Sequence, residues 1–216
     1  MAMNQPGKGY LISIAVFGPV EWFALLASGK PVTVEVHEHY IKQTWRNRYR
    51  ILTANGPLDL PVPVIKTLGN HTPVSRITID RKQPWWRNHW RAIQSAYTKS
   101  PWFIHFAPDL EGFLFSEFRN LTDIATASVE LVRKWTGLEM PFIISDHYIE
   151  NPDENFLDLR NRISPKKAPW ITPPPYYQVF SDRFGFVPGL SILDLVFNLG
   201  PETAAYLHSI PLPEGL

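Results

Sequence analysis

The chain of 216 residues contains no cysteine, which excludes disulfide bonds and thiolate ligands for a metal. It also lacks any apolar run near the roughly 18 residues that a membrane-spanning helix needs. The apolar run at 10–17 is short, carries Ser13 and has no small-residue cleavage site, so it does not indicate a secretory signal peptide. We therefore expect a cytoplasmic protein without integral membrane contact.

An excess of charge of one sign is absent as well. The chain has 21 Lys and Arg against 20 Asp and Glu, a formal net charge of +1. General nucleic-acid binders usually carry a strong basic excess, so we expect no nucleic-acid partner, and any electrostatic function must be local. Eight Trp, eight Tyr and thirteen Phe supply a large apolar core. This length and composition predict one domain spanning residues 1–216.

The first part of the chain has the pattern of a strand, a helix and a second strand. Residues 11–17 are apolar, residues 20–28 have helical spacing, and residues 31–36 are rich in β-branched side chains. This succession indicates a βαβ unit with parallel strands. Residues 140–145 are expected to form a third core strand. The predicted fold class is α/β, with a mostly parallel or mixed central sheet.

A β-hairpin is predicted at about 48–65. Asn55 and Gly56 lie between two strand-like segments, and this dipeptide favours the positive φ angles of a two-residue type I′ turn. Pro61 and Pro63 cannot donate to a ladder of hydrogen bonds, so the second arm is expected at a sheet edge.

The middle third of the chain is expected to be helical. Residues 84–99 place four apolar side chains on one helical stripe, namely Trp86, Trp90, Ile93 and Tyr97. A longer helix is predicted between the cap residue Asn120 and the terminating residue Gly137. Residues 164–177 (SPKKAPWITPPPYY) favour polyproline II, so we expect an extended arm or lid and not a packed element.

The densest polar cluster is at 35–50, with the sequence EVHEHYIKQTWRNRYR. If 46–50 is extended, Arg46, Arg48 and Arg50 share one face of a strand. Arginine suits two-point recognition of phosphate or carboxylate groups, and nearby Lys42 and Trp45 offer a charge and a platform for a sugar or base. The candidate substrate-binding residues are Lys42, Trp45, Arg46, Asn47 and Arg48.

Two interpretations of these arginines stay open. They form an anion site for a phosphate-bearing small molecule such as a sugar nucleotide, or they pair with acidic side chains across the sheet. Glu35, Asp59 and Asp80 are the candidate partners in the second case.

Glu35, His37 and His39 alternate along the chain, so on a strand their side chains share one face. Glu35 and His37 are the candidate catalytic residues, with His37 as a general base beside the arginines. A metal site made of all three is a second interpretation. A solvated strand end whose imidazoles pair with neighbours is the third. The sequence does not identify a cofactor.

Several motifs together resemble the WbqC-like protein family. The segment YIKQTWRNRYRI is followed by the Asn-Gly hairpin and L-x-V-P-V, then by ITID, W-x-x-x-H-W-x-x-I-x-x-A-Y, SPWF and, near the C-terminus, PGLSILDLVFNLGPE. The resemblance covers the chain from about Tyr10 to Glu202. It implies a bacterial protein associated with O-antigen and other surface-polysaccharide gene sets.

The residues and the resemblance together predict an enzyme of bacterial surface-polysaccharide (O-antigen type) biosynthesis. We expect a transferase, of acyl or aminoacyl type, that acts on a sugar-nucleotide or amino-sugar intermediate. The pathway rests on the resemblance, whereas the anion site rests on Lys42, Arg46 and Arg48. The alternative is a non-catalytic binding or scaffold subunit for polysaccharide-synthesis enzymes, because the chain shows local charge without an evident nucleophile. A homo-oligomer is compatible with either.

Overall fold

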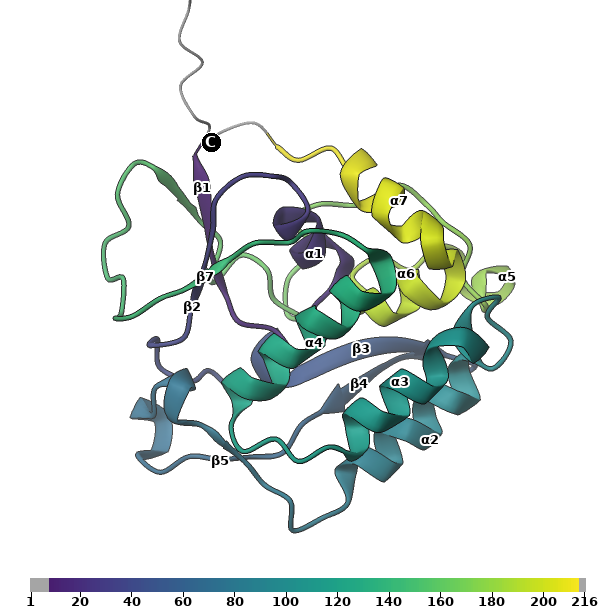
Figure 1. The fold of residues 1–216 in the computed structure, drawn as a ribbon, viewed down its shortest axis with the longest axis horizontal. Helices are drawn as coiled ribbons and strands as arrows, with labels where there is room; N and C mark the ends of the chain where they lie inside the picture. Colours follow the sequence, from purple (N-terminus) through teal and green to yellow (C-terminus); the bar gives the residue numbers. More distant parts are fainter. Residues whose placement is uncertain (1–7, 214–216) are drawn as a thin grey trace, which may run out of the picture.

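A four-stranded sheet with the order β7-β2-β1-β8 forms one side of the protein (Figure 1). The computed structural model describes residues 8–213. The strands of this sheet are β1 (Gly9–Ser13), β2 (Val32–Glu35), β7 (Ile143–Ile144) and β8 (Phe156–Asp158). Each neighbouring pair runs parallel, so the predicted α/β class with a parallel sheet is confirmed.

Strands β1 and β2 are joined by α1 (Val20–Leu26), which completes the predicted βαβ unit. In their register, Tyr10 lies opposite Val32 and Ser13 lies opposite Glu35. The apolar residues of β1 are almost completely buried, as expected for a central parallel strand covered on both faces. The register brings the carboxyl ends of the two strands to the same edge of the sheet.

The expected third core strand at 140–145 is wrong in extent and in position. Only Ile143 and Ile144 pair with β2, and they form an edge strand whose side chains are 70% and 38% exposed. Met140 is buried but lies outside the strand. Pro141 has no amide hydrogen to give to a ladder, so pairing begins only beyond it. The other edge of the sheet is β8, which the sequence analysis did not identify.

The predicted hairpin forms from β3 (Arg48–Thr53) and β4 (Gly56–Pro61), with the turn one residue earlier than expected. Its two loop residues are Ala54 and Asn55, whereas Gly56 already pairs with Thr53 and has the positive φ of +104°. The Thr53 hydroxyl accepts from the Asn55 amide and donates to the Gly56 carbonyl, which closes the turn at this point. Asn55 does not have a positive φ, so the turn is not type I′.

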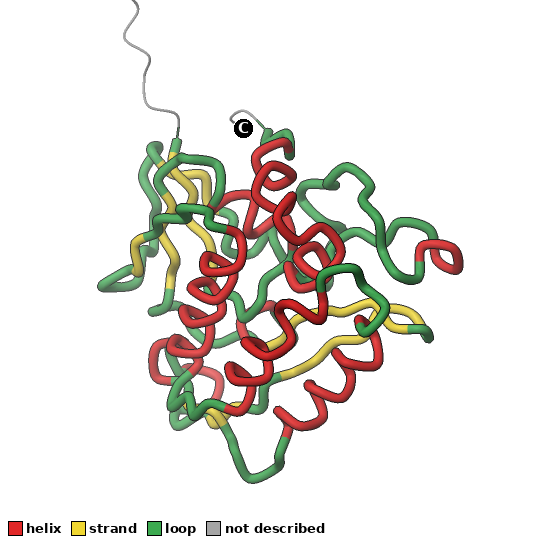
Figure 2. The backbone as a smooth tube through the Cα atoms, turned by 45° about the vertical axis from the view of Figure 1, so that its right-hand side comes forward, coloured by secondary structure: helices red, strands yellow, loops and turns green. Residues whose placement is uncertain are grey.

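The second arm of the hairpin stops at Pro61. Beyond the two prolines, β5 (Val64–Ile65) pairs with β6 (Thr78–Ile79) and not with β3. The β3–β4 pair is therefore a separate two-stranded sheet, and Figure 2 shows helices lying between it and the parallel sheet.

Three helices confirm the predicted helical middle third: α2 (Trp85–Tyr97), α3 (Phe103–Phe115) and α4 (Leu121–Thr136). Three shorter helices follow nearer the C-terminus: α5 (Ser181–Phe184), α6 (Ile192–Leu199) and α7 (Thr203–Ser209). The Asn120 side chain accepts from the Asp123 amide at the start of α4, and Gly137 ends that helix at a φ of +68°. In the described part of the chain, no helix combines the length and apolar character needed to cross a membrane.

Helix α2 packs on the hairpin through two buried polar links. The Tyr49 hydroxyl donates to Nδ1 of His89 at 2.8 Å, while Nε2 of the same ring donates to the Pro61 carbonyl at 3.1 Å. Burial lowers the pKa of His89 to about 4, so the ring stays neutral and serves this structural contact. The Tyr97 hydroxyl accepts from the Leu52 amide and carries the link further, to α6.

The proline-rich segment 164–177 contains no helix or strand, but it is anchored to the core and is not an unpacked arm. Ile171 is buried, and its amide donates to the buried carboxylate of Glu21 at 3.0 Å. The Tyr176 hydroxyl donates to Asp194 at 2.7 Å. The extended segment packs because buried carboxylates of α1 and α6 accept hydrogen bonds from it.

Asp194 is the centre of this second anchor. It is fully buried and accepts hydrogen bonds from Tyr97 at 2.9 Å, Tyr176 at 2.7 Å and Gln178 at 3.1 Å. Burial raises the pKa of Asp194 to about 6 in spite of these donors. At pH values between the ordinary pKa of 3.8 and the raised pKa of about 6, the folded protein keeps a proton on Asp194 that the unfolded chain has released. The free energy of unfolding therefore falls as the pH rises through this range.

We predict that Asp194→Asn removes this pH dependence. The free energy of unfolding of the wild type minus that of the variant should fall by up to about 3 kcal/mol between about pH 4 and pH 6.5. Urea unfolding across this range measures the difference. The exposed residue Asp182 supplies the control, since Asp182→Asn should leave the profile unchanged. A difference between wild type and Asp194→Asn that stays constant with pH contradicts the prediction.

Candidate functional site

The candidate site lies outside the carboxyl ends of the parallel strands. The chain passes from β1 to β2 and then to β7 on one side, whereas β8 lies on the other side of β1. Ligands of open α/β sheets bind in the crevice at such a reversal of strand order. Here the crevice is bordered by the turn after β1, by the segment after β2 and by residues 159–167, which we name the β8 loop.

Three adjoining cavities make up this cleft. The histidine lobe has a volume of about 440 Å³ and is lined by His37, Glu38, His39, Ile41, Tyr148 and Asn161. The basic lobe, of about 210 Å³, is lined by Ile41, Thr44, Arg46, Arg160, Asn161, Ile163, Ser164, Lys166 and Lys167. The outer lobe, of about 230 Å³, is lined by Asp158, Asn161, Arg162 and Lys167. The lobes are continuous, since Asn161 lines all three.

Arg46 forms part of the floor of the basic lobe and is only 2% exposed. Its Nε donates to one oxygen of Glu38 at 2.9 Å, and its Nη2 lies 2.7 Å from the other. The same Nη2 donates to the Ser13 hydroxyl at 2.8 Å, at the carboxyl end of β1. Within residues 8–213, no hydrogen bond engages the remaining Nη1. The guanidinium is therefore fixed by its acidic partner, with one edge left for a ligand.

Arg160 lies beside Arg46 in the lining and is fixed in a similar way. Its Nε and Nη2 donate to the two oxygens of Asp158 at 2.9 and 2.7 Å, and its Nη1 donates to the Ile149 carbonyl at 2.6 Å. The guanidinium also lies 5.5 Å from the centre of the Tyr148 ring. These contacts tie the start of the β8 loop to the segment that follows β7.

Glu35 does not face the cleft. Its carboxylate is completely buried and accepts from the His37 amide at 2.7 Å, the Ser145 hydroxyl at 2.8 Å and the Ile149 amide at 2.9 Å. Arg160 lies 3.6 Å away. Glu35 thus joins the carboxyl end of β2 to the segment after β7, and it positions His37 through the backbone.

His37, one of the two candidate catalytic residues of the sequence analysis, lines the cleft. Its ring lines the histidine lobe, and Nε2 lies 3.1 Å from the Ser145 carbonyl oxygen. A carbonyl only accepts, so the neutral ring carries its proton on Nε2 and keeps a lone pair on Nδ1. In this tautomer, Nδ1 is the ring atom that can accept a proton.

The predicted stripe of three arginines is wrong. Residues Trp45–Asn47 form a 3₁₀ turn and the extended strand begins only at Arg48, so Arg46 is directed away from the other two. Arg48 and Arg50 both bind Asp59, at 3.3 and 2.6 Å. Burial raises the pKa of Asp59, but hydrogen bonds and charge from these arginines outweigh it and hold that pKa below its usual value.

The arginines therefore follow the ion-pair interpretation, with Glu38 and Asp59 as their partners. Asn47 is buried and donates to the Val62 carbonyl at 2.8 Å. Trp45 is buried, and the guanidinium of Arg50 lies 5.3 Å from the centre of the Trp45 ring.

Lys42 is exposed and lines none of the three lobes. Of the residues predicted to act in binding or catalysis, only Arg46 and His37 line the cleft. The others stabilise the fold around it or lie outside it.

The sequence analysis missed the main basic segment of the site. The β8 loop reads LRNRISPKK, with four cationic side chains: Arg160, Arg162, Lys166 and Lys167. This density of charge after an apolar strand was a signal that the sequence contained. Neither lysine forms an ion pair in the described part of the chain, although Lys167 donates to the Asn161 carbonyl at 2.7 Å.

The metal interpretation is not supported. Across residues 8–213, no three His, Asp or Glu side chains lie together so that they could hold a metal ion. Glu35 is directed into the interior while His37 and His39 line the cleft, because the strand that would align them ends at Glu35.

A profile of the WbqC-like protein family matches residues 17–174, which include β2, the hairpin and the β8 loop. The chain belongs to the WbqC-like protein family. This WbqC-like chain is also 26% identical over 213 residues to a protein of Mycobacterium tuberculosis (strain ATCC 25618 / H37Rv) named uncharacterized protein Rv1507c. The match covers 87% of this chain and 91% of that protein. No solved structure matches the chain.

Arg46→Ala is predicted to destabilise the protein by about 3–5 kcal/mol, because it leaves the buried Glu38 carboxylate without its partner. Arg48→Ala should cost at most about 1 kcal/mol, since Asp59 keeps Arg50 and the pair is partly exposed. Urea unfolding of both variants provides the measurement. Equal, small losses would mean that Arg46 is not part of the structural framework.

Proposed function

We propose that this WbqC-like protein binds a phosphate-bearing small molecule, such as a sugar nucleotide, in the cleft, with the phosphate on the β8 loop. The observation that supports this most directly is the lining of the basic lobe, which contains two lysines, two arginines and no carboxylate. Because Asp158 and Glu38 already neutralise the arginines, Lys166 and Lys167 supply the uncompensated charge.

The rest of the basic lobe suits the same ligand. Ser164 places a hydroxyl group in the lining, and Arg46 and Arg160 add their guanidinium groups. Phosphate oxygens accept hydrogen bonds from all of these groups. The adjoining histidine lobe, at about 440 Å³, has the size of a small-molecule pocket and offers the Tyr148 ring as an apolar surface. It is the place for the sugar or acceptor portion.

We infer that the protein is a transferase of acyl or aminoacyl type in bacterial surface-polysaccharide (O-antigen type) biosynthesis. The family supplies the pathway, and His37 supplies the chemistry. Its Nδ1 lone pair can accept the proton of a sugar amine or hydroxyl as that group attacks the acyl carbon of an activated acyl donor. The bond from that carbon to the donor's leaving group then breaks, and the leaving group takes the proton from the histidine. The Ser145 carbonyl holds the ring in the required tautomer. Glu35 acts as a positioning residue for this histidine.

The binding part of the proposal predicts the effect of Lys166→Ala/Lys167→Ala. The double variant should lose about 10- to 150-fold in affinity for nucleotide sugars, because a charge-assisted contact is removed. Its unfolding midpoint without ligand should remain that of the wild type, since both lysines are exposed. Thermal shift across a panel of nucleotide sugars measures this, with about 2.7 kcal/mol of stabilisation at 100 times the Kd.

Lys30→Ala/Lys66→Ala is the matched control, because it removes two lysines outside the cleft. Absence of a shift in the wild type across the whole panel contradicts the binding proposal.

The catalytic part of the proposal predicts that His37→Ala keeps the ligand-induced thermal shift but loses transfer. Loss of a general base lowers the rate by about 10²- to 10⁴-fold. Product formation from an acyl donor and a nucleotide-linked amino sugar is followed by mass spectrometry. His105→Ala, at an exposed histidine of α3, should be as active as the wild type. Binding without turnover in the wild type would contradict the transferase and favour a non-catalytic binding subunit.

A further inference from the structure

A second basic region lies on α2, away from the cleft. The segment 81–99 contains five cationic residues and no Asp or Glu: Arg81, Lys82, Arg87, Arg91 and Lys99. Its formal charge is +5, whereas the whole chain carries +1, which leaves −4 for the rest. The near-neutral composition of the whole chain thus conceals a local concentration of positive charge in this segment.

Most charges of this segment are presented to solvent, whereas Arg81 also donates to the Ser116 carbonyl at 3.0 Å. Lys82, Arg87, Arg91 and Lys99 are exposed, and in the part of the chain that the structure describes none of the five residues makes an ion pair. The opposite side of α2 is buried against the hairpin through Trp85, His89, Trp90, Ile93 and Tyr97. The helix is therefore fixed with its cationic side outward.

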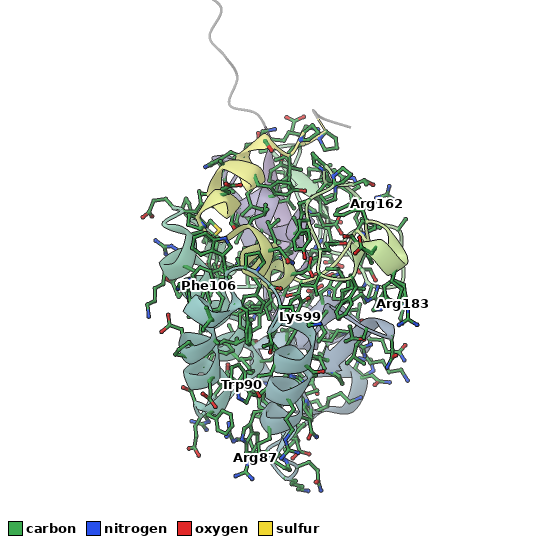
Figure 3. The ribbon with its side chains drawn as sticks, turned by 90° about the vertical axis from the view of Figure 1, so that its right-hand side faces the viewer. Arg87, Trp90, Lys99, Phe106, Arg162 and Arg183 are labelled. Atoms are coloured by element: carbon green, nitrogen blue, oxygen red, sulfur yellow. The ribbon has the colours of Figure 1, made fainter. Side chains whose placement is uncertain are left out.

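The cations extend along one side of the molecule. Figure 3 shows Arg87 at one end of α2 and Lys99 beyond its other end, both on the side that faces the viewer. Twelve helical residues span roughly 18 Å. Cations spread over this length on the outer side of a helix can contact many anionic groups at once. They therefore fit an extended anionic surface better than a single phosphate group.

Apolar groups accompany the cations. Trp86 is partly exposed and stacks under Arg81, whose guanidinium lies 4.2 Å from the ring centre. On the neighbouring helix α3, Ile104 is 76% exposed and Phe115 is 42% exposed. Basic residues with Trp and exposed apolar side chains are typical of the boundary between water and lipid headgroups. A surface for single-stranded nucleic acid usually offers free aromatic rings for stacking, and most rings of α2 are buried.

The acidic residues of the neighbouring helix α3 do not cancel the positive charge of this surface. Asp109 is paired with Lys134, which hydrogen-bonds it at 2.8 Å. Glu111 is exposed on that helix. Asp80 directly precedes Arg81, accepts from the Lys82 amide at 2.9 Å and offsets part of the charge of the five cations.

We propose that the exposed side of α2, with Arg81, Lys82, Arg87, Arg91 and Lys99, docks the protein peripherally on an anionic lipid surface. The contact is electrostatic, and no helix enters the bilayer. The docking surface is independent of the cleft and of the activity proposed for it.

The test is sedimentation with vesicles of phosphatidylcholine containing about one-third phosphatidylglycerol, against vesicles of phosphatidylcholine alone. Wild type should bind only the anionic vesicles, and binding should weaken as salt shortens the Debye length from about 10 Å at 0.1 M to about 3 Å at 1 M. Each cation near the surface contributes roughly fivefold, so Arg87→Glu/Arg91→Glu should lose at least about 25-fold in affinity. Its melting temperature and its nucleotide-sugar shift should stay those of the wild type.

Lys66→Glu/Arg76→Glu is the matched control, since it makes the same change in net charge at exposed residues outside α2. It should keep most of the vesicle binding. The proposal is overturned if wild type does not bind the anionic vesicles at low salt, or if the control loses as much as the α2 variant. It is also overturned if a single-stranded RNA of equal charge competes the protein off the vesicles completely, because the surface is then a nucleic-acid site.

Discussion

The buried carboxylate of Glu35 holds together the edge of the sheet on which the candidate site depends. Three donors converge on it: the His37 amide, two residues further along the chain, and the Ser145 hydroxyl and the Ile149 amide from the segment after β7. A buried carboxylate without such donors is strongly unfavourable, so these segments reach their positions only together. Arg160 lies next to this group and carries the same constraint into the β8 loop. Glu35 thus shapes the cleft although it lines none of the three lobes.

The same physical principle recurs elsewhere in the fold. Glu38 fixes Arg46, Glu21 anchors Ile171, and Asp194 collects the hydroxyl groups of Tyr97 and Tyr176. Each of these acids is buried. Glu21 and Asp194 link segments far apart in the sequence, whereas Glu38 fixes an arginine eight positions away. Charges that satisfy one another in the interior are unavailable for ligands. The lysines of the β8 loop and the cations of α2 are left free, and both proposals rest on such unpaired charges.

The local sequence pattern was sufficient to predict a helix or strand where contacts with neighbouring elements did not alter it. The βαβ unit, the hairpin, α4 with its cap at Asn120 and the family were all predicted correctly from the sequence. The hairpin turn was displaced by one residue, because the Thr53 hydroxyl closes it earlier than the Asn-Gly preference indicates. The strand expected at 140–145 shrank to two residues at an edge, since Pro141 cannot join a ladder.

The sequence by itself determined the fold class, the family and the supply of cationic side chains. Only the tertiary structure decided which cations meet an acid. Each of Arg46 and Arg160 pairs with an acid close to it in the chain, Glu38 and Asp158, but the two arginines lie 114 positions apart and no sequence pattern indicates that they line one lobe. Nor does periodicity reveal that Glu35 turns inward while His37 lines a cavity. The meeting of these side chains depends on distances between remote segments, and those distances exist only once the sheet has formed.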